Sequence, residues 1–364
     1  MSSCNSSSSL SNQQSNSTTE QEIFKNYMKL EQWTKKIINE IVITPQTTIT
    51  TKKNRYSNVL PNYSTRVSLL NNINKENDDM NYINANFVGS KQQFIATQAP
   101  LPNTIHDFWD MVWKQNIGLI VMLTNLKEEK LVPNSQLLQV IEKANCYWPT
   151  NADEIIEGET WKIIQFLPTV EFRESQKVKN NENNNNNNGK KKKKLKPEYV
   201  IRQFRMTQKN KKKYDEKENE CESENIINKD RIITMLHYRA WPDHGVPSDY
   251  NSFNNFYNHY CHLKAKINQF PILVHCSAGI GRTGVFCAIS NIMDDNAPYH
   301  FSSAQLLSIV KKQIQELRLQ RFGCVQGLDQ FYFIIRFIEH LLHYRRLKAT
   351  DSFSSSLSYS SSSF

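Results

Sequence analysis

The stretch from Pro271 to Phe286 constrains this chain more than any other part of its 364 residues. It begins with a short apolar run, Ile272 to Val274, which is typical of a buried strand. A loop of small residues follows, and the apolar segment from Val285 to Met293 then predicts a helix. The pattern therefore predicts a strand, a tight loop and a helix in direct succession.

The loop in this stretch combines three chemical features. Small residues let the backbone curl until successive N–H groups point inward and form a nest for an anion at the start of a helix. Cys276 opens the loop, and the positive field of such a nest favours the thiolate, which is the nucleophilic form of cysteine. Arg282 closes the loop, and its planar guanidinium binds a phosphate through two hydrogen bonds. Together these features indicate phosphoryl transfer through a cysteinyl-phosphate.

Two other interpretations of the loop explain fewer of its residues. The spacing of Gly279, Gly281 and Gly284 also fits the dinucleotide-binding pattern. That pattern requires an acidic residue about 20 positions later, and residues 301 to 308 contain none. A buried structural role for Cys276 would leave Arg282 and the glycines without a purpose.

The ten residues from His275 to Gly284 read His-Cys-Ser-Ala-Gly-Ile-Gly-Arg-Thr-Gly. They resemble the signature loop of the protein tyrosine phosphatases, a family of cysteine-based enzymes specific for phosphotyrosine. The resemblance is to the non-receptor members of this family. The resemblance extends over roughly residues 22 to 345, interrupted by low-complexity inserts. It implies an α/β fold with a single domain. A twisted mixed β-sheet flanked by helices would carry the phosphate-binding loop between a strand and a helix.

This resemblance also implies a role for each residue of the loop. Cys276 attacks phosphorus, and Arg282 binds the phosphate oxygens together with the loop N–H groups. Thr283 donates a hydrogen bond to the thiolate when it leaves in the second step. The residues that supply the backbone cradle are Ser277, Ala278, Gly279, Ile280 and Gly281.

Two further stretches resemble family loops that act on protons and water. The sequence from Trp241 to Pro247 is similar to the mobile acid loop, so Asp243 is expected to be the general acid and then the general base. Trp241 is expected to be the hinge of that loop. Gln326 is expected to position the attacking water, with Gln330 assisting it.

Three residues are expected, by the same resemblance, to shape the pocket. Tyr56, in the sequence Lys-Asn-Arg-Tyr, lines its side and stacks on the substrate ring. Asn58 occupies the position where the family typically has an Asp that holds the main chain of the substrate. Glu128 corresponds to the residue that holds the signature Arg, although a solvated pair of Glu128 and Glu129 on a surface loop is the alternative.

The positive charge of the chain is concentrated in one segment. The sequence contains 45 Lys and Arg against 35 Asp and Glu, a formal charge of +10. Residues 177 to 196 alone hold eight Lys and one Glu, so no nucleic-acid-binding face is expected. The Lys run allows three interpretations: a contact with an anionic surface, a nuclear address, and a solvated expansion without a function.

Seven cysteines show no Cys-x-x-Cys pair and no spacing typical of a metal site. A thiolate enzyme needs a reducing compartment, and the N-terminal residues contain no apolar signal core. The most apolar stretch, Phe331 to Leu342, is short and contains charges. We therefore expect a cytoplasmic protein without a transmembrane segment, with a nuclear location possible through the Lys run. Arg and backbone dipoles supply the positive field, so no metal or cofactor is expected.

The expected organisation has three parts. Residues 1–20 form a disordered Ser- and Asn-rich N-terminus, 21–346 the catalytic domain with inserts at 174–197 and 209–229, and 347–364 a disordered Ser-rich tail. The expected activity is hydrolysis of phosphotyrosine in protein substrates during intracellular signal transduction. Two rivals are a dual-specificity or lipid phosphatase and a phosphotyrosine-binding module without turnover. The presence of Tyr56 argues against the first, and the presence of Cys276, Arg282 and Asp243 argues against the second.

Overall fold

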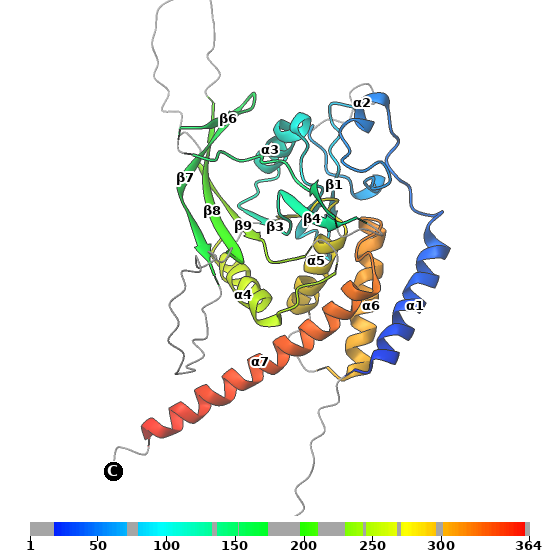
Figure 1. Cartoon of the computed structure of the whole chain (residues 1–364), viewed down its shortest axis with the longest axis vertical. Helices are drawn as coiled ribbons and strands as arrows, with labels where there is room; N and C mark the ends of the chain where they lie inside the picture. The colour runs from blue at the N-terminus through cyan, green and yellow to red at the C-terminus, as the bar shows by residue number, and fades with distance from the viewer. Residues whose placement is uncertain are drawn as a thin grey trace, which may run out of the picture.

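The computed structural model describes residues 18–70, 79–132, 137–151, 153–173, 197–209, 230–242, 245–267, 271–295 and 301–360 (Figure 1). The helices in chain order are α1 Glu20–Ile37, α2 Thr48–Thr51, η1 Tyr63–Thr65, η3 Pro102–Thr104, α3 Ile105–Lys114, α4 Tyr250–Ile267, α5 Gly281–Asp295, α6 Ser303–Gln320 and α7 Leu328–Ser360. The strands are β1 Ala85–Val88, β2 Phe94–Thr97, β3 Leu119–Met122, β4 Lys127–Leu131, β5 Leu138–Glu142, β6 Ile155–Glu157, β7 Trp161–Phe172, β8 Tyr199–Gln208, β9 Arg231–Tyr238 and β10 Ile272–His275.

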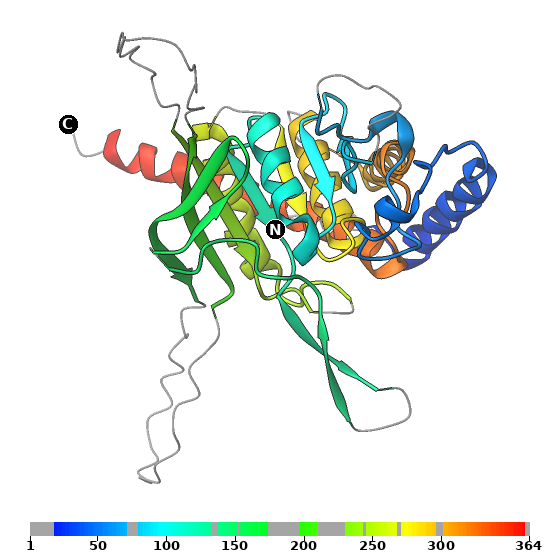
Figure 2. The same cartoon turned by 90° about the horizontal axis from the view of Figure 1, so that it is seen from above.

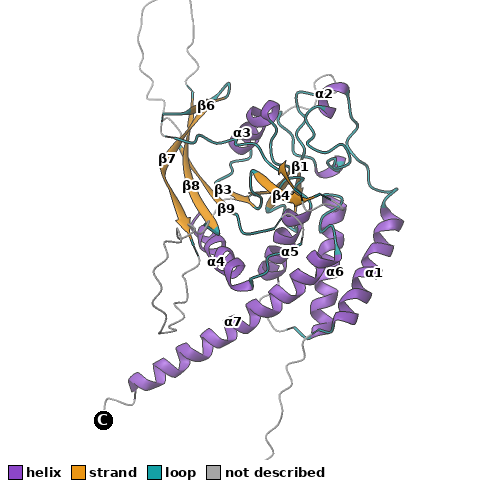
Figure 3. Cartoon of the chain, viewed as in Figure 1, coloured by secondary structure: helices purple, strands orange, loops and turns teal. Residues whose placement is uncertain are grey.

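Eight of these strands form one mixed sheet in the order β1-β2-β10-β3-β9-β8-β7-β6. The four in the middle, β2, β10, β3 and β9, run parallel. The strands at both edges pair antiparallel with their neighbours. Helices flank the sheet (Figure 3), so the predicted α/β class with a mixed sheet is confirmed.

The strand that leads into the signature loop lies in the middle of the sheet. β10 is hydrogen-bonded to β2 on one side and β3 on the other, and all four of its residues are buried. Ile272 and Val274 belong to the core shared with α5, α6 and α7, whereas Leu273 belongs to the core shared with α3. Because both faces of the strand are covered, its sequence is a continuous apolar run and does not alternate.

The two remaining strands form a hairpin outside the main sheet. β4 and β5 pair antiparallel only with each other, and Figure 2 shows this hairpin standing out from the body of the molecule. Its root follows β3, the neighbour of β10. The first residues of β4 therefore begin close to the signature loop, while the far end of the hairpin is exposed.

The N-terminal boundary of the domain lies slightly earlier than predicted. The capping box of Thr19 and Glu22 is present, and α1 starts at Glu20. Thr18 is itself buried, and its hydroxyl donates a hydrogen bond of 2.7 Å to Glu339 on α7. The ordered chain therefore includes residues that the sequence assigned to the disordered N-terminus, because a long-range partner binds them.

The last helix continues well beyond its predicted end. The sequence predicts a disordered tail from residue 347, but α7 runs from Leu328 to Ser360. This corrects the prediction, and the reason is local. No Gly or Pro interrupts that range, and a Ser costs a helix at most about 0.7 kcal/mol relative to Ala. Among the described residues, no helix has both the length and the apolar character needed to cross a membrane.

The low-complexity inserts lie almost wholly outside the described residues. The strands that flank them are described: β7 pairs with β8, and β8 pairs with β9, both antiparallel. Each insert therefore joins two neighbouring strands of the same sheet.

Candidate active site

The loop between β10 and α5 has its carbonyl groups directed away from the cavity. The guanidinium of Arg321, which is fully buried, donates to the carbonyls of Ala278 and Gly279 at 3.1 and 2.7 Å. The carbonyls of Ser277 and Ile280 accept from backbone N–H groups outside the loop. In a peptide the N–H points opposite to the preceding carbonyl, so the loop N–H groups face inward. The loop therefore has the polarity of an anion-binding nest.

Cys276 lies at the base of this nest and is 5% exposed. The N–H of Gly279 donates to its sulfur at 3.3 Å. Gly279 has φ +73°, and a Cβ at this position would overlap the carbonyl oxygen of Thr97 on β2. Only glycine satisfies both the backbone angle and the close packing. The bend that turns the N–H groups toward the sulfur thus depends on this residue.

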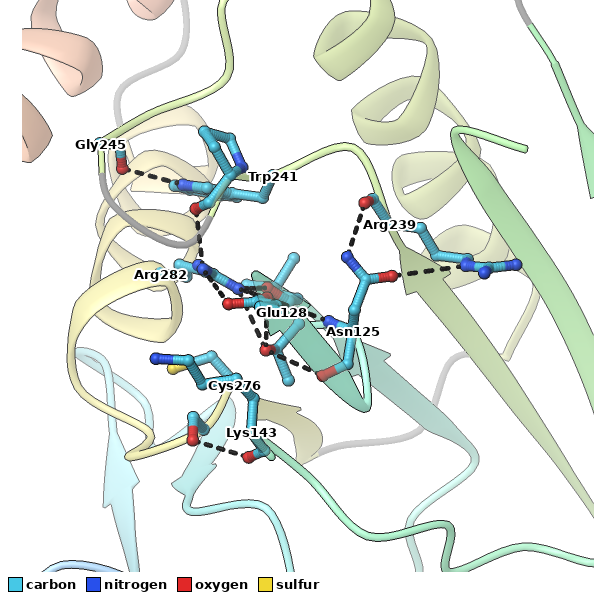
Figure 4. Close-up of polar contacts among 12 residues, drawn as sticks. Asn125, Glu128, Lys143, Arg239, Trp241, Gly245, Cys276 and Arg282 are labelled. Atoms are coloured by element: carbon cyan, nitrogen blue, oxygen red, sulfur yellow. Dashed lines mark hydrogen bonds and ion pairs between the residues drawn. The ribbon is translucent and has the colours of Figure 1, made fainter. Parts of the chain in front are cut away.

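Arg282 is held by a carboxylate from the base of the hairpin (Figure 4). Its two terminal nitrogens donate to the two oxygens of Glu128, Nη1 to Oε1 at 2.6 Å and Nη2 to Oε2 at 3.0 Å. Nη1 also donates to Thr124 Oγ1, and Nη2 donates to the carbonyl of Pro242 at 2.7 Å. Both partners of the ion pair are buried. Such a bidentate pair fixes the plane of the guanidinium beside Cys276, and it places Glu128 inside the site, not on a solvated loop.

Tyr56 forms one side of the cavity. The Ser277 hydroxyl donates to the carbonyl of Lys143 at 2.6 Å, so it accepts from the Tyr56 hydroxyl at 2.8 Å. These two hydrogen bonds join a loop from the N-terminal part of the chain to the signature loop and to the segment after β5. The Tyr56 ring is thereby held against the cavity wall.

The cavity has a volume of about 490 Å³. The predicted site residues that line it are Tyr56, Asn58, Glu128, Cys276, Ser277, Ala278, Arg282, Gln326 and Gln330. Gly279 and Ile280 belong to the loop, Gly281 is the first residue of α5, and none of the three is among the residues that line the cavity. Lining residues that the sequence did not indicate are Val59, Thr124, Lys143 and Asp329.

The structure describes the two ends of the acid loop. Trp241 is buried, and its indole N–H donates to the carbonyl of Gly245 at 3.2 Å. This hydrogen bond joins the two described ends of the loop (Figure 4). Asp243, the predicted general acid, lies outside the described residues.

The hydrogen bond predicted for Thr283 belongs to the second step of the reaction and stays a prediction. The hydroxyl of Thr283 is buried and has no hydrogen-bond partner among the described residues. It therefore does not donate to the sulfur of Cys276 in this structure. Thr283 lies in the first turn of α5, directly after Arg282.

The turn that carries Gln326 packs on the signature loop. The N–H of Gln326 donates to Gln330 Oε1 at 2.9 Å, and a Cβ on Gly281 would overlap the Gln326 side-chain oxygen. The preceding residue, Val325, has φ +60°, which is strained for a β-branched side chain. Arg318 holds this strained turn by donating to the carbonyls of Cys324 and Val325 at 3.0 and 2.7 Å.

The comparisons with known proteins agree with this arrangement. A family model described as protein-tyrosine phosphatase matches residues 50–340. The chain belongs to the protein-tyrosine phosphatase family. The matched residues include the signature loop, the hairpin, the acid loop and the turn of Gln326. The segments that form the cavity therefore all lie within the family domain.

Several curated phosphatases are similar to this chain. It is 33% identical over 308 residues to receptor-type tyrosine-protein phosphatase eta of Gallus gallus, which is 82% of this chain and 17% of the relative. It is 32% identical over 299 residues to tyrosine-protein phosphatase 3 of Dictyostelium discoideum, covering 80% and 25%. It is 32% identical over 286 residues to tyrosine-protein phosphatase non-receptor type 7 of Mus musculus, covering 78% and 62%. The chain thus spans between 17% and 62% of the lengths of these relatives.

Two residues of this domain, Arg321 and His275, support the signature loop through contacts that no sequence pattern predicted. Arg321 is close to the Gln326 motif in the sequence, but only the fold shows that it binds the loop carbonyls. His275 precedes the nucleophile, and its Nδ1 lies 3.0 Å from the Cys276 carbonyl, so this nitrogen must carry a proton. Its Nε2 then accepts from the Tyr147 hydroxyl at 2.7 Å. Burial lowers the pKa of His275 to about 4, so the ring is neutral at pH 7.

Proposed function

We propose that this chain hydrolyses phosphotyrosine in proteins through a cysteinyl-phosphate intermediate. The observation that carries the proposal is the position of Arg282, held bidentate by Glu128 beside Cys276 in a cavity that the loop N–H groups face. The names of the similar proteins, all tyrosine-protein phosphatases, support the same substrate.

In the first step, the thiolate of Cys276 attacks phosphorus, and an S–P bond forms as the bond from phosphorus to the tyrosine oxygen breaks. The equatorial oxygens are bound by Arg282 and the N–H groups of residues 277 to 282, which stabilise their charge in the transition state. Asp243 gives a proton to the departing tyrosine oxygen. The phenol group of tyrosine has a pKa of about 10. The tyrosine oxygen is therefore a better leaving group at pH 7 when it departs with this proton.

In the second step, water attacks phosphorus and the S–P bond breaks, which releases inorganic phosphate and restores the thiolate. Asp243, deprotonated after the first step, accepts the proton of that water. Gln326 and Gln330 line the cavity next to Arg282, where their amides would orient the water.

The preference for tyrosine rests on Tyr56. Its ring forms a side wall and is held through Ser277, so an aromatic substrate ring would stack on it. A phosphoserine side chain has no ring that could stack there.

We also propose that the phosphatase acts inside the cell, in signal transduction. Its five cysteines among the described residues are free, and a nucleophilic thiol survives best in a reducing compartment. The Lys-rich insert as an anionic-surface contact or nuclear address stays a hypothesis, since it lies outside the described residues.

The test compares hydrolysis of a phosphotyrosine peptide, a phosphoserine peptide and a phosphoinositide by the purified chain and by Cys276→Ser. We expect turnover of the phosphotyrosine peptide alone, and none by the variant, because an alkoxide is far harder to form than a thiolate. Comparable rates on the phosphoinositide would favour the lipid-phosphatase rival. Binding of the phosphotyrosine peptide without turnover by the wild type would favour the binding module.

A second variant tests the acid. Asp243→Ala should lower kcat for the phosphotyrosine peptide by about 10²–10⁴-fold, the usual contribution of general acid catalysis. Binding should survive, so phosphotyrosine proteins should co-purify with this variant. The nearby Asp249, on the segment before α4, provides the control, since Asp249→Ala should retain kcat. A wild-type kcat in Asp243→Ala would assign the proton to another group.

A further inference from the structure

A second cleft, of about 680 Å³, lies next to the active-site cavity. Glu128 lines both, so one carboxylate and its strand separate them. The side chains that define the second cleft are Trp148, Arg202, His237, Arg239, Trp241 and Pro242. They come from β8, β9, the start of the acid loop and the segment after the hairpin, and the catalytic mechanism above does not use their charges.

Two neutral groups hold Arg202 in this cleft. Its guanidinium carbon lies 4.9 Å from the centre of the Trp148 ring, and its Nη1 lies 3.3 Å from Nδ1 of His237. Nε2 of His237 lies 2.8 Å from the carbonyl of Thr124, so Nε2 carries the proton and Nδ1 accepts from Arg202. Burial and the charge of Arg202 lower the pKa of His237 to about 3. His237 is therefore a neutral support for the guanidinium.

Arg239 lines the same cleft and is oriented by one amide (Figure 4). The Asn125 side chain donates to the Arg239 carbonyl at 2.9 Å and accepts from its Nε at 3.5 Å. Both terminal nitrogens of Arg239 lack an acceptor among the described residues. Both guanidinium groups line the same cleft. Burial first, and then the charge of Arg239, lowers the pKa of Arg202, and the charge of Glu171 offsets this only in part.

The described carboxylates near the cleft offset these two charges only in part, because Glu171 acts on Arg202 through its charge without forming an ion pair with it. Neither Arg202 nor Arg239 forms an ion pair with a described carboxylate. Glu128 is already paired with Arg282. Glu129 and Lys127 at the rim are both exposed and offset each other. Two like charges that share a partly buried cleft without an ion-paired carboxylate raise the energy of the folded chain, and an anion between them would lower it.

We propose that this cleft is a second binding site for a small multivalent oxyanion, bridged by Arg202 and Arg239 over the rings of Trp148 and Trp241. A phosphate monoester and a polycarboxylate share the required chemistry. No cysteine lines the cleft, so the site has no nucleophile and would bind the anion without hydrolysing it. Glu128 and Pro242 line this cleft and also accept hydrogen bonds from Arg282. A single layer of residues would therefore separate the bound anion from the Arg282 guanidinium.

Equilibrium dialysis with inorganic phosphate tests the proposal by counting bound ions per chain. The wild type should bind two, one in each site, while Arg239→Gln and Arg202→Gln should each bind one. Arg205→Gln is the matched control, because Arg205 lies on the same strand but stacks on Phe166 outside the cleft, and it should still bind two. Citrate should displace one ion from the wild type if the site accepts polycarboxylates, and none if it accepts only phosphates.

A kinetic measurement separates the two sites. Phosphate in the active site competes with a small aryl phosphate substrate, and its inhibition constant should be the same in the wild type and in Arg239→Gln to within about twofold. One bound ion in the wild type would overturn the proposal. Two bound ions in both Arg239→Gln and Arg202→Gln would also overturn it, since the ion would then lie elsewhere. The dialysis does not depend on turnover, so it stands even if the activity proposed above is wrong.

Discussion

At the scale of single residues, Gly279 has the least freedom to change. Its φ of +73° and the carbonyl of Thr97 beside it leave no room for a Cβ. We predict that Gly279→Ala lowers kcat/KM for a small aryl phosphate by about 10²-fold, because a displacement of about 1 Å in a catalytic group costs that much. Steady-state kinetics on the two proteins measures the effect.

A second glycine provides the control for the added methyl group. Gly327 follows Gln326 in the sequence, but a Cβ there would meet no atom within 4 Å and its φ is not left-handed. Gly327→Ala should keep the wild-type Tm, whereas Gly279→Ala should lower it. A normal Tm and normal kinetics in Gly279→Ala would mean that the loop tolerates a different backbone path.

Asn58 is expected to influence the strength of peptide binding. It lines the cavity mouth beside Tyr56, where the family typically has an Asp, and a carboxylate accepts hydrogen bonds about twice as strong as a neutral amide does. We predict that Asn58→Asp raises kcat/KM for a phosphotyrosine peptide by roughly fivefold, equivalent to about 1 kcal/mol. The gain should be larger for peptides with basic flanks.

The small aryl phosphate is the control for this prediction, because it has no main chain. Its kcat/KM should change by less than twofold in Asn58→Asp. Equal changes on peptide and small substrate, or no change on either, would show that Asn58 does not contact the peptide main chain.

At the scale of elements, Arg318 connects α1 to the turn of Gln326. Its Nη1 donates to Glu31 and Thr34 on α1 at 2.9 and 2.6 Å. Its other nitrogens bind the carbonyls that precede Gln326. A helix outside the sheet thus helps to hold a strained turn at the site.

We predict that Arg318→Met lowers the free energy of unfolding by about 2–6 kcal/mol, since two buried carbonyls lose their donor at about 1–3 kcal/mol each. Urea denaturation measures the change. Lys312→Met on the same helix is the control: its side chain is 79% exposed and its ion pair with Glu316 spans 3.9 Å, so the loss should be below about 1 kcal/mol. Similar losses in the two variants would contradict the role of Arg318 at the turn.

At the scale of the whole molecule, two neutral histidines make stability depend on pH. The pKa of His237 is lowered to about 3 and that of His275 to about 4, mainly by burial. The unfolded chain takes up these protons near pH 6.5, but the folded chain does so only near pH 3–4. The unfolded state therefore binds more protons in this window. The stability contributed by these residues is complete above pH 6.5 and is lost as the pH falls toward 4.

Urea denaturation at several pH values between 6.5 and 5 measures this loss in a range where most surface carboxylates remain ionised. His237→Gln should flatten the dependence, because Gln donates and accepts as the neutral imidazole does but takes up no proton. His262→Gln, at an exposed position on α4, should leave the slope unchanged. A wild-type slope of zero would mean that the folded chain protonates these histidines as readily as the unfolded chain does.

Local patterns were sufficient for much of the fold and for part of the site. The apolar run of β10, the glycine-rich loop and the capping box of α1 are set by neighbours within a few residues, and each was found where the sequence indicated it. Local patterns failed at the chain ends. Thr18 is ordered by Glu339, more than 300 residues away, and α7 continues through a Ser-rich segment that composition assigned to disorder.

By itself, the sequence determined the chemistry proposed for this protein: a nucleophile, a phosphate-binding loop and an Arg within ten residues, whose spacing needs only a strand, a turn and a helix. The tertiary structure alone decided what surrounds them. Glu128 reaches Arg282, Arg321 turns the loop carbonyls outward, and Arg202 and Arg239 share a second cleft, all through strands and loops distant in the chain. Such contacts depend on the order of strands in the sheet, which a single sequence does not encode in any local pattern, because pairing is a property of residues that meet only after folding.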